Sequence, residues 1–173
     1  MIEGNTVIRP AAVADAPCIA NVHIHSWRET YSDLFSKRFM DHLSLEFSER
    51  YFMWRAVLET GEDSFFVADH SKYGPVGFAC GGKSREGEYS DFGELYAIYL
   101  LKVFHGNQLG YQLQRKVFDS LKEEGLCKAF CWVLEANPAI CFYERTGASQ
   151  KDFKKGNVGD DEITEIRMVW DTI

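Results

Sequence analysis

The residues best suited to chemistry lie in one stretch, where an apolar strand leads into a helix through a turn that contains glycine. We expect the strand over 94–101, where aromatic and aliphatic residues predominate. The turn reads His105-Gly106-Asn107-Gln108-Leu109-Gly110, and apolar residues then recur at helical spacing up to Leu121. The first backbone N–H groups of a helix have no partner within it, and the helix dipole is positive there. The turn therefore predicts an anion site for a phosphate or a pyrophosphate.

This turn resembles the acetyl-CoA signature of the GCN5-related N-acetyltransferases, the GNAT family, in which Arg/Gln-x-x-Gly-x-Gly/Ala follows an apolar strand. Gly110 matches the last glycine, whereas His105 stands where arginine or glutamine is usual and Gln108 stands where glycine is usual. The resemblance implies that backbone in the preceding strand pairs with the pantetheine arm as an added strand would. It implies a cofactor site made by Ile98, Tyr99, Leu100, His105, Gly106, Asn107, Gln108, Leu109, Gly110, Tyr111 and Gln112.

A second segment, from Asn137 to Ala148, carries the same resemblance. The family commonly shows Asn-x-x-Ala-x-x-Phe-Tyr-x-Lys/Arg-x-Gly-Phe here. The chain has the corresponding residues Asn137, Phe142, Tyr143, Arg145 and Gly147, with Asn137 one residue closer to the Phe-Tyr pair than in the family pattern. The resemblance implies that Asn137, Phe142, Tyr143 and Arg145 border the cofactor, with Asn137 bonded to its arm and Tyr143 near its sulfur. Two such segments separated by one strand are far more specific than either alone.

Acetyl transfer to an amine needs one group that removes a proton and another that supplies one. Glu94 is the candidate base, because it lies in an otherwise apolar strand where an unpaired charge is costly. The alternative for Glu94 is a glutamate at a strand end that faces solvent. The resemblance gives Tyr143 the role of proton donor to the departing thiolate, and the alternative for Tyr143 is a packed aromatic with a bonded hydroxyl.

Two aromatic residues, Trp27 and Tyr31, are the candidates for contact with the acceptor. They lie in a segment that resembles the first helix of many small-molecule N-acetyltransferases, and the alternative is that both are core aromatics. Together with the formal charge of −7, they favour a small cationic amine such as a polyamine. We expect direct attack in a ternary complex, because the two segments occur without a matched nucleophile-base signature. Two alternatives stay open: a protein or peptide acceptor, at an N-terminus or a lysine, and a non-catalytic acyl-CoA-binding regulatory module.

Several other classes of protein find no support in the sequence. No histidines form His-Glu-x-x-His, so no metal site is predicted, and a Gly-x-Ser-x-Gly elbow and a Walker lysine are both missing. The negative charge argues against nucleic acid and anionic membranes as partners. No apolar run approaches the ~20 residues that span a bilayer, and the N-terminus shows no signal-peptide pattern. Five cysteines without Cys-x-x-Cys indicate reduced thiols in a cytoplasmic protein.

The 173 residues suit a single domain, 1–173, with one sizeable core. The expected order β-α-α-β-β-β-α-β-α-β-β is that of the GNAT fold, an α/β (α+β) architecture with a mixed, mostly antiparallel sheet flanked by helices. We expect closing strands over 149–153 and 163–170, with a loop over 154–161. Asp15 and Asn137 are expected to cap helices, and a second apolar helix is expected from about Phe39 to Leu58. A homodimer also stays open, since dimers are common among relatives.

Overall fold

The computed structural model describes residues 4–33, 35–36, 40–41 and 47–173. Within these residues, seven strands form one sheet in the order β1-β2-β3-β4-β5-β7-β6. Neighbouring strands are antiparallel except β4 and β5, which are parallel, so the expected mixed and mostly antiparallel sheet is confirmed. The strands are β1 (Thr6–Pro10), β2 (Ser64–His70), β3 (Gly74–Lys83), β4 (Gly93–Leu100), β5 (Ala129–Leu134), β6 (Ser149–Val158) and β7 (Asp161–Trp170).

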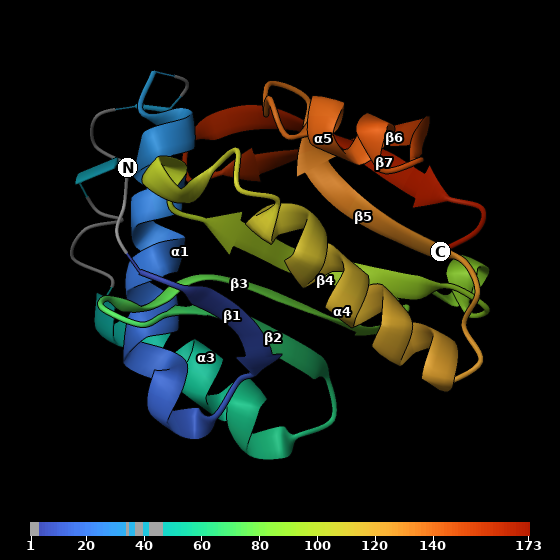
Figure 1. Ribbon diagram of the computed structural model, residues 1–173. Coiled ribbons are helices and arrows are strands. Elements are labelled where there is room, and N and C mark those ends of the chain that lie inside the picture. The colour runs from blue at the N-terminus through green and yellow to red at the C-terminus, as the bar shows by residue number, and fades with distance from the viewer. Residues whose placement is uncertain (1–3, 34, 37–39, 42–46) are drawn as a thin grey trace.

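Helices cover both faces of this sheet (Figure 1). They are α1 (Ala16–Tyr31), α3 (Phe47–Thr60), α4 (Leu109–Glu123) and α5 (Ile140–Arg145), with short 3-10 helices η1 (Val13–Asp15), η2 (Gly87–Tyr89) and η3 (Lys102–Phe104). One apolar cluster joins α1 and α3 to β2 and β3, and a second joins α4 to the other face. The apolar stripe predicted for α4 is buried, since Leu113, Val117 and Leu121 are fully enclosed. Burial of that stripe fixes α4, and hence its N-terminus, relative to β4.

The two parallel strands at the centre of the sheet separate soon after they meet. β4 and β5 pair only at Gly93 with Ala129 and at Glu94 with Phe130. Beyond these pairs, β4 remains bonded to β3 as far as Leu100, and β5 remains bonded to β7 as far as Leu134. From Leu95 onward, the edge of β4 that faces β5 therefore has no strand partner in β5.

The prediction of a loop over 154–161 is wrong, because the two closing strands continue through this stretch. Lys154 pairs with Glu165 and Val158 pairs with Asp161, which leaves a tight turn at Gly159 and Asp160. Nearly every residue of β6 is exposed, so this edge strand lacks the alternation of apolar and polar residues by which a half-buried strand is predicted.

The expected helix caps also differ from the structure. The Asp15 carboxylate does not cap α1; it accepts a hydrogen bond from the backbone N–H of Ala12 and pairs with the guanidinium of Arg9. Asn137 instead accepts from the N–H of Ala139 at 2.8 Å, and α5 begins only at Ile140. The second apolar helix is present as α3, and the Phe39 and Leu43 assigned to its start lie outside the described residues.

Candidate active site

The turn between β4 and α4 presents backbone amides at the start of a helix. Gly106 has φ 80° and Gln108 has φ 60°, and among the described residues Gln108 is the one non-glycine residue with positive φ. The first helical bond of α4 runs from Gln112 N–H to the Gln108 carbonyl at 2.9 Å. The amides of Leu109, Gly110 and Tyr111 come before that bond, so they have no partner within the helix. Since the turn is exposed from 105 to 108, an anion can approach these amides.

His105 takes a position that the sequence pattern does not reveal. Its Nε2 donates a hydrogen bond to the Leu100 carbonyl at 2.9 Å, which ties the turn back to the end of β4. Asn107 makes a similar local bond, from Nδ2 to the Phe104 carbonyl at 3.4 Å. These two side chains therefore shape the turn, and the backbone amides at the start of α4 remain as the groups suited to an anion.

The second predicted segment lies against the first. A Cβ built on Gly110 would meet the Phe142 ring at 3.8 Å, so α5 packs beside the first turn of α4. Within α5, Tyr143 is buried and Arg145 is exposed. The glycine turn and the Phe-Tyr pair, about thirty residues apart in sequence, thus form one continuous region.

A cavity of about 320 Å³ occupies the space where β4 and β5 separate. It brings together six of the predicted residues from four parts of the chain. They are Trp27 and Tyr31 of α1, Ile98 and Tyr99 of β4, Asn137 of the loop after β5, and Tyr143 of α5. Predicted acceptor and cofactor residues therefore line the same cavity. Leu100, the turn residues, Phe142 and Arg145 lie outside its lining.

Tyr143 is suited to hold a proton at this cavity. Its side chain is 6% exposed, and its hydroxyl is hydrogen-bonded to the thiol of Cys131. Burial, with smaller contributions from Cys131, Tyr99 and Tyr31, raises the pKa of the Tyr143 hydroxyl well above its usual value. The hydroxyl is thus protonated at neutral pH and can act as a donor.

A network of rings and hydrogen bonds holds the aromatic wall of the cavity. Trp27 Nε1 donates to the Tyr99 hydroxyl at 3.0 Å, and the Tyr99 ring stacks on His23 with centroids 4.7 Å apart. His23 Nδ1 in turn accepts from Trp54 Nε1 of α3 at 3.1 Å. Burial lowers the pKa of His23 to about 3, so the ring at the centre of this network is neutral. Trp54 thereby helps to position Tyr99 from outside the cavity.

Glu94 lies apart from the cavity lining, at the end of β4 where the strand still pairs with β5. It is 3% exposed, and its oxygens accept from the backbone N–H of Arg85 at 3.0 Å and from the Arg85 guanidinium. Burial raises the pKa of the Cys131 thiol, and the charge of Glu94 adds to that effect. Glu94 thus acts electrostatically on a group that does line the cavity, although its own oxygens are held by Arg85.

The cavity residues that were not singled out in the sequence include Cys131, Trp132 and Glu165. Glu165 belongs to a strand predicted from apolar residues, so the reasoning that selects Glu94, a carboxylate in an apolar strand, applies to it equally. Cys131 and Trp132 carry no such signal, because a continuous apolar run does not tell which residues face a cavity.

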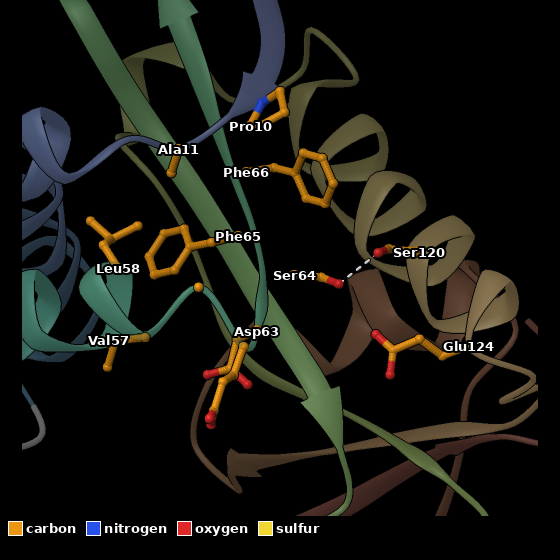
Figure 2. A pocket seen from close by; sticks show the side chains of 12 residues that line it. Pro10, Ala11, Val57, Leu58, Asp63, Ser64, Phe65, Phe66, Ser120 and Glu124 are labelled. Atoms are coloured by element: carbon orange, nitrogen blue, oxygen red, sulfur yellow. Dashed lines mark hydrogen bonds between the residues drawn. The ribbon is translucent and has the colours of Figure 1, made fainter.

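A second cavity, of about 420 Å³, lies between the C-terminal ends of α3 and α4 and the start of β2 (Figure 2). Ser64 donates to Ser120 at 2.7 Å across it, and the carboxylates of Asp63 and Glu124 lie nearby. Burial raises the pKa of Asp63. None of the candidate site residues lines this cavity, whereas six of them line the cavity between β4 and β5.

Comparison with known proteins identifies the family of the chain. Residues 24–148 match the family model described as the acetyltransferase (GNAT) family. The chain belongs to the GNAT family. This GNAT chain is 31% identical over 163 residues to the uncharacterized N-acetyltransferase YuaI of Bacillus subtilis strain 168, covering 94% of this chain and 91% of that protein. It is also 33% identical over 110 residues to the uncharacterized N-acetyltransferase MJ1207 of Methanocaldococcus jannaschii, covering 61% of this chain but only 47% of that relative.

Solved structures share the GNAT fold at low sequence identity. The PaiA N-acetyltransferase of Thermoplasma acidophilum, solved with coenzyme A, superimposes with a TM-score of 0.72 at 20% identity, covering 93% of this chain and 98% of that one. A GCN5-related N-acetyltransferase from Rhodopseudomonas palustris gives a TM-score of 0.75 at 16% identity, covering 100% and 99%. These likenesses confirm the fold that the sequence predicts.

As a GNAT member, the chain is an acetyl-CoA-dependent N-acetyltransferase with acetyl-CoA as its co-substrate. The described residues fit that molecule, because the first amides of α4 have no partner within the helix and the β4 edge beyond Glu94 has no partner in β5. Within the described ranges, no helix is long and apolar enough to cross a membrane. The same ranges contain no group of three His, Cys, Asp or Glu side chains that could hold a metal ion.

Proposed function

We propose that this GNAT enzyme acetylates the primary amine of a small cationic acceptor, such as a polyamine, by direct attack within a ternary complex. The observation that carries this proposal is the cavity of about 320 Å³, which the aromatic residues Trp27, Tyr31 and Tyr99 line together with Tyr143. Aromatic faces attract cations, and a cavity of this size suits a small molecule. An acceptor amine inside it would lie close to the proton donor.

The co-substrate is assigned to the turn and to the free edge of β4. In the proposal, the turn from His105 to Gln112 holds the pyrophosphate through its amides, and the β4 edge at Ile98, Tyr99 and Leu100 pairs with the pantetheine arm. Asn137, Phe142 and Arg145 are the further residues assigned to the co-substrate. Acetyl-CoA, when bound there, supplies the acetyl group as a thioester and leaves as the thiol.

In this proposal, two residues of the chain carry out the proton transfers. Tyr143 holds the proton that the leaving sulfur takes up, which its raised pKa supports. Glu94, which pairs with Phe130 beside Cys131, takes the proton of the amine, either directly or through water. Both oxygens of Glu94 also accept bonds from Arg85, and the Glu94→Gln variant tests this assignment.

Direct transfer is supported by the state of the cysteine that lines the cavity. A covalent acetyl-enzyme would need a nucleophile there, and thiolate is the reactive form of cysteine. Burial raises the pKa of Cys131 and outweighs the opposite effect of its bond to Tyr143, so this cysteine is protonated at neutral pH. A protonated, buried thiol is a poor nucleophile, which favours attack by the acceptor itself.

A thiol-release assay tests the proposal. Acetyl-CoA is supplied with a panel of polyamines, monoamines, lysine peptides and peptides with free N-termini, and the initial rates are measured over both substrates. We expect turnover with the small cationic amines and intersecting lines in the double-reciprocal plot. Parallel lines would overturn direct attack, preference for a peptide would overturn the acceptor class, and CoA binding without turnover on any amine would indicate a regulatory module.

Three further assignments belong to the same proposal. We place the enzyme in the cytoplasm, where its five cysteines, all free in the structure, stay reduced. Residues 1–173 are taken to act as one domain. A homodimer is tested by light scattering of the purified chain, where a mass near 19.8 kDa would show a monomer.

A further inference from the structure

One cationic side chain already lies at the edge of the proposed acceptor site. The ammonium of Lys154 is 4.0 Å from the centroid of the Trp132 ring and 3.4 Å from Oε2 of Glu165. Lys154 and Glu165 are directly opposite each other on β6 and β7, so their side chains share one face of the sheet. An aromatic face and a carboxylate that converge on one ammonium form a cation subsite.

The two groups that hold this ammonium face the cavity, whereas Lys154 does not. Trp132 and Glu165 both line the space between β4 and β5. Glu165 also lies close enough to Tyr31 and Tyr99 for its charge to contribute to the raised pKa of both hydroxyls. A ligand in the cavity can therefore reach the same ring and carboxylate from inside.

The subsite itself is fixed by contacts that do not involve Lys154. Trp132 Nε1 donates to Oε1 of Glu86 at 2.7 Å, and the other oxygen of Glu86 accepts from Arg167 at 2.9 Å. The Arg167 guanidinium lies 4.5 Å from the Trp132 centroid and is itself 9% exposed. The indole is therefore held in place whether or not Lys154 lies over it.

Lys154, in contrast, is held weakly. Its side chain is 47% exposed, and its 3.4 Å contact with Glu165 is longer than a good charge-assisted hydrogen bond. Exposed ion pairs and exposed cation–π contacts are both weak, partly because a long side chain loses freedom in them. A ligand cation that does not have to order a lysine chain can compete for this place.

We propose that the Trp132–Glu165 subsite binds a second positive charge of the acceptor, which displaces the Lys154 ammonium. This inference rests on the proposed function and narrows it to amines that carry a second cationic group. The reacting amine lies at Tyr143, and the second ammonium replaces Lys154 over the indole. Lys154 then acts as a resident competitor that sets selectivity for such acceptors over monoamines.

Binding of 1,4-diaminobutane and n-butylamine to the CoA-loaded enzyme, measured by calorimetry, tests this proposal without turnover. We expect Lys154→Met to bind the diamine about two- to five-fold more tightly and to leave n-butylamine unchanged. Glu165→Gln should weaken diamine binding about ten-fold. Lys155→Met is the matched control, because it removes the same charge one residue along the exposed β6 strand.

The outcomes separate this inference from the proposed function. Equal diamine affinity in Lys154→Met and Lys155→Met, or unchanged affinity in Glu165→Gln, would overturn the subsite even if amines are acetylated. Absence of thiol release with every amine would overturn the acetylation proposal, and the binding measurements would still decide the subsite. Melting temperatures of the three variants, together with Lys154→Gln as a second replacement, show that any change is not a loss of folding.

Discussion

The side-chain amide of Asn137 donates a hydrogen bond to the hydroxyl of Tyr31, which joins the loop after β5 to the last turn of α1. The carbonyl oxygen of the same side chain accepts from the N–H of Ala139, so the orientation of the amide is fixed by the backbone before α5. The sequence assigns Asn137 to the cofactor and Tyr31 to the acceptor. This bond therefore connects the two halves of the proposed site.

Removal of the Tyr31 hydroxyl should loosen that connection. Tyr31→Phe keeps the ring, whose centroid lies 4.8 Å from that of Trp27, but it leaves the Asn137 amide without its partner. We expect a loss of about 1 kcal/mol in the free energy of unfolding, measured in urea, and a higher KM for the acceptor. Tyr73→Phe is the control, because that tyrosine is 55% exposed. Equal losses in the two variants would contradict the role given to the bond.

Tyr143→Phe should lower kcat about 100-fold or more, because it removes the proposed proton donor and keeps the packed ring. Calorimetric affinity for CoA should stay near that of the wild type, which separates chemistry from binding. Because the pKa of the Tyr143 hydroxyl is raised, we also expect that its deprotonation does not reduce kcat below about pH 10. Unchanged kinetics in the variant would remove Tyr143 from the mechanism.

The two glutamates near the cavity should affect different kinetic constants. Glu94→Gln should lower kcat at neutral pH and flatten the acidic limb of the pH–rate profile, as the loss of a general base does. Glu165→Gln should keep that limb and raise the KM of a diamine acceptor, because it weakens cation binding. If the acidic limb of the pH–rate profile is lost in Glu165→Gln and kept in Glu94→Gln, the general base is Glu165.

Gly110 offers a test of the anion site that leaves the fold intact. A Cβ at this position would make only an ordinary contact with Phe142, at 3.8 Å, so Gly110→Ala should fold and gain up to about 1 kcal/mol in helix stability. Gly110→Val should also fold but lose detectable CoA binding by calorimetry, because its side chain obstructs the amides at the start of α4. Gly87→Ala, where a Cβ meets nothing within 4 Å, is the control. Tight CoA binding by the valine variant would place the pyrophosphate elsewhere.

The parts of the fold set by local pattern were predictable, and those set by strand order were not. The β4 strand, the glycine turn and the buried stripe of α4 follow from periodicity along one continuous segment. Lys154, Glu165 and Trp132 come from three strands and meet only because β7 lies between β5 and β6. Asn137 and Tyr31 are 106 residues apart, and neither residue type alone indicates that they pair.

The buried His23 should make the protein less stable as the pH is lowered. Its folded-state pKa of about 3 lies below the value of about 6.5 expected in the unfolded chain, because burial and, to a lesser degree, Arg50 disfavour the charged ring. Between these values the unfolded chain takes up a proton that the folded chain does not, so the free energy of unfolding falls by about 1.4 kcal/mol per pH unit for this group. Above pH ~6.5 both states are neutral and this dependence disappears.

Urea denaturation of the wild type from pH 7.5 to 4.5 should therefore show a loss of about 2 to 3 kcal/mol from His23. His23→Asn keeps an acceptor for Trp54 Nε1 but cannot be protonated, so its stability should depend less on pH over that range. His25→Asn is the control, since His25 lies on the exposed side of the same helix. If His23→Asn and the wild type lose stability equally as the pH falls, protonation of His23 is not the cause of that loss. The wall formed with Tyr99 would then tolerate a charged ring, and the acceptor cavity should keep its shape at low pH.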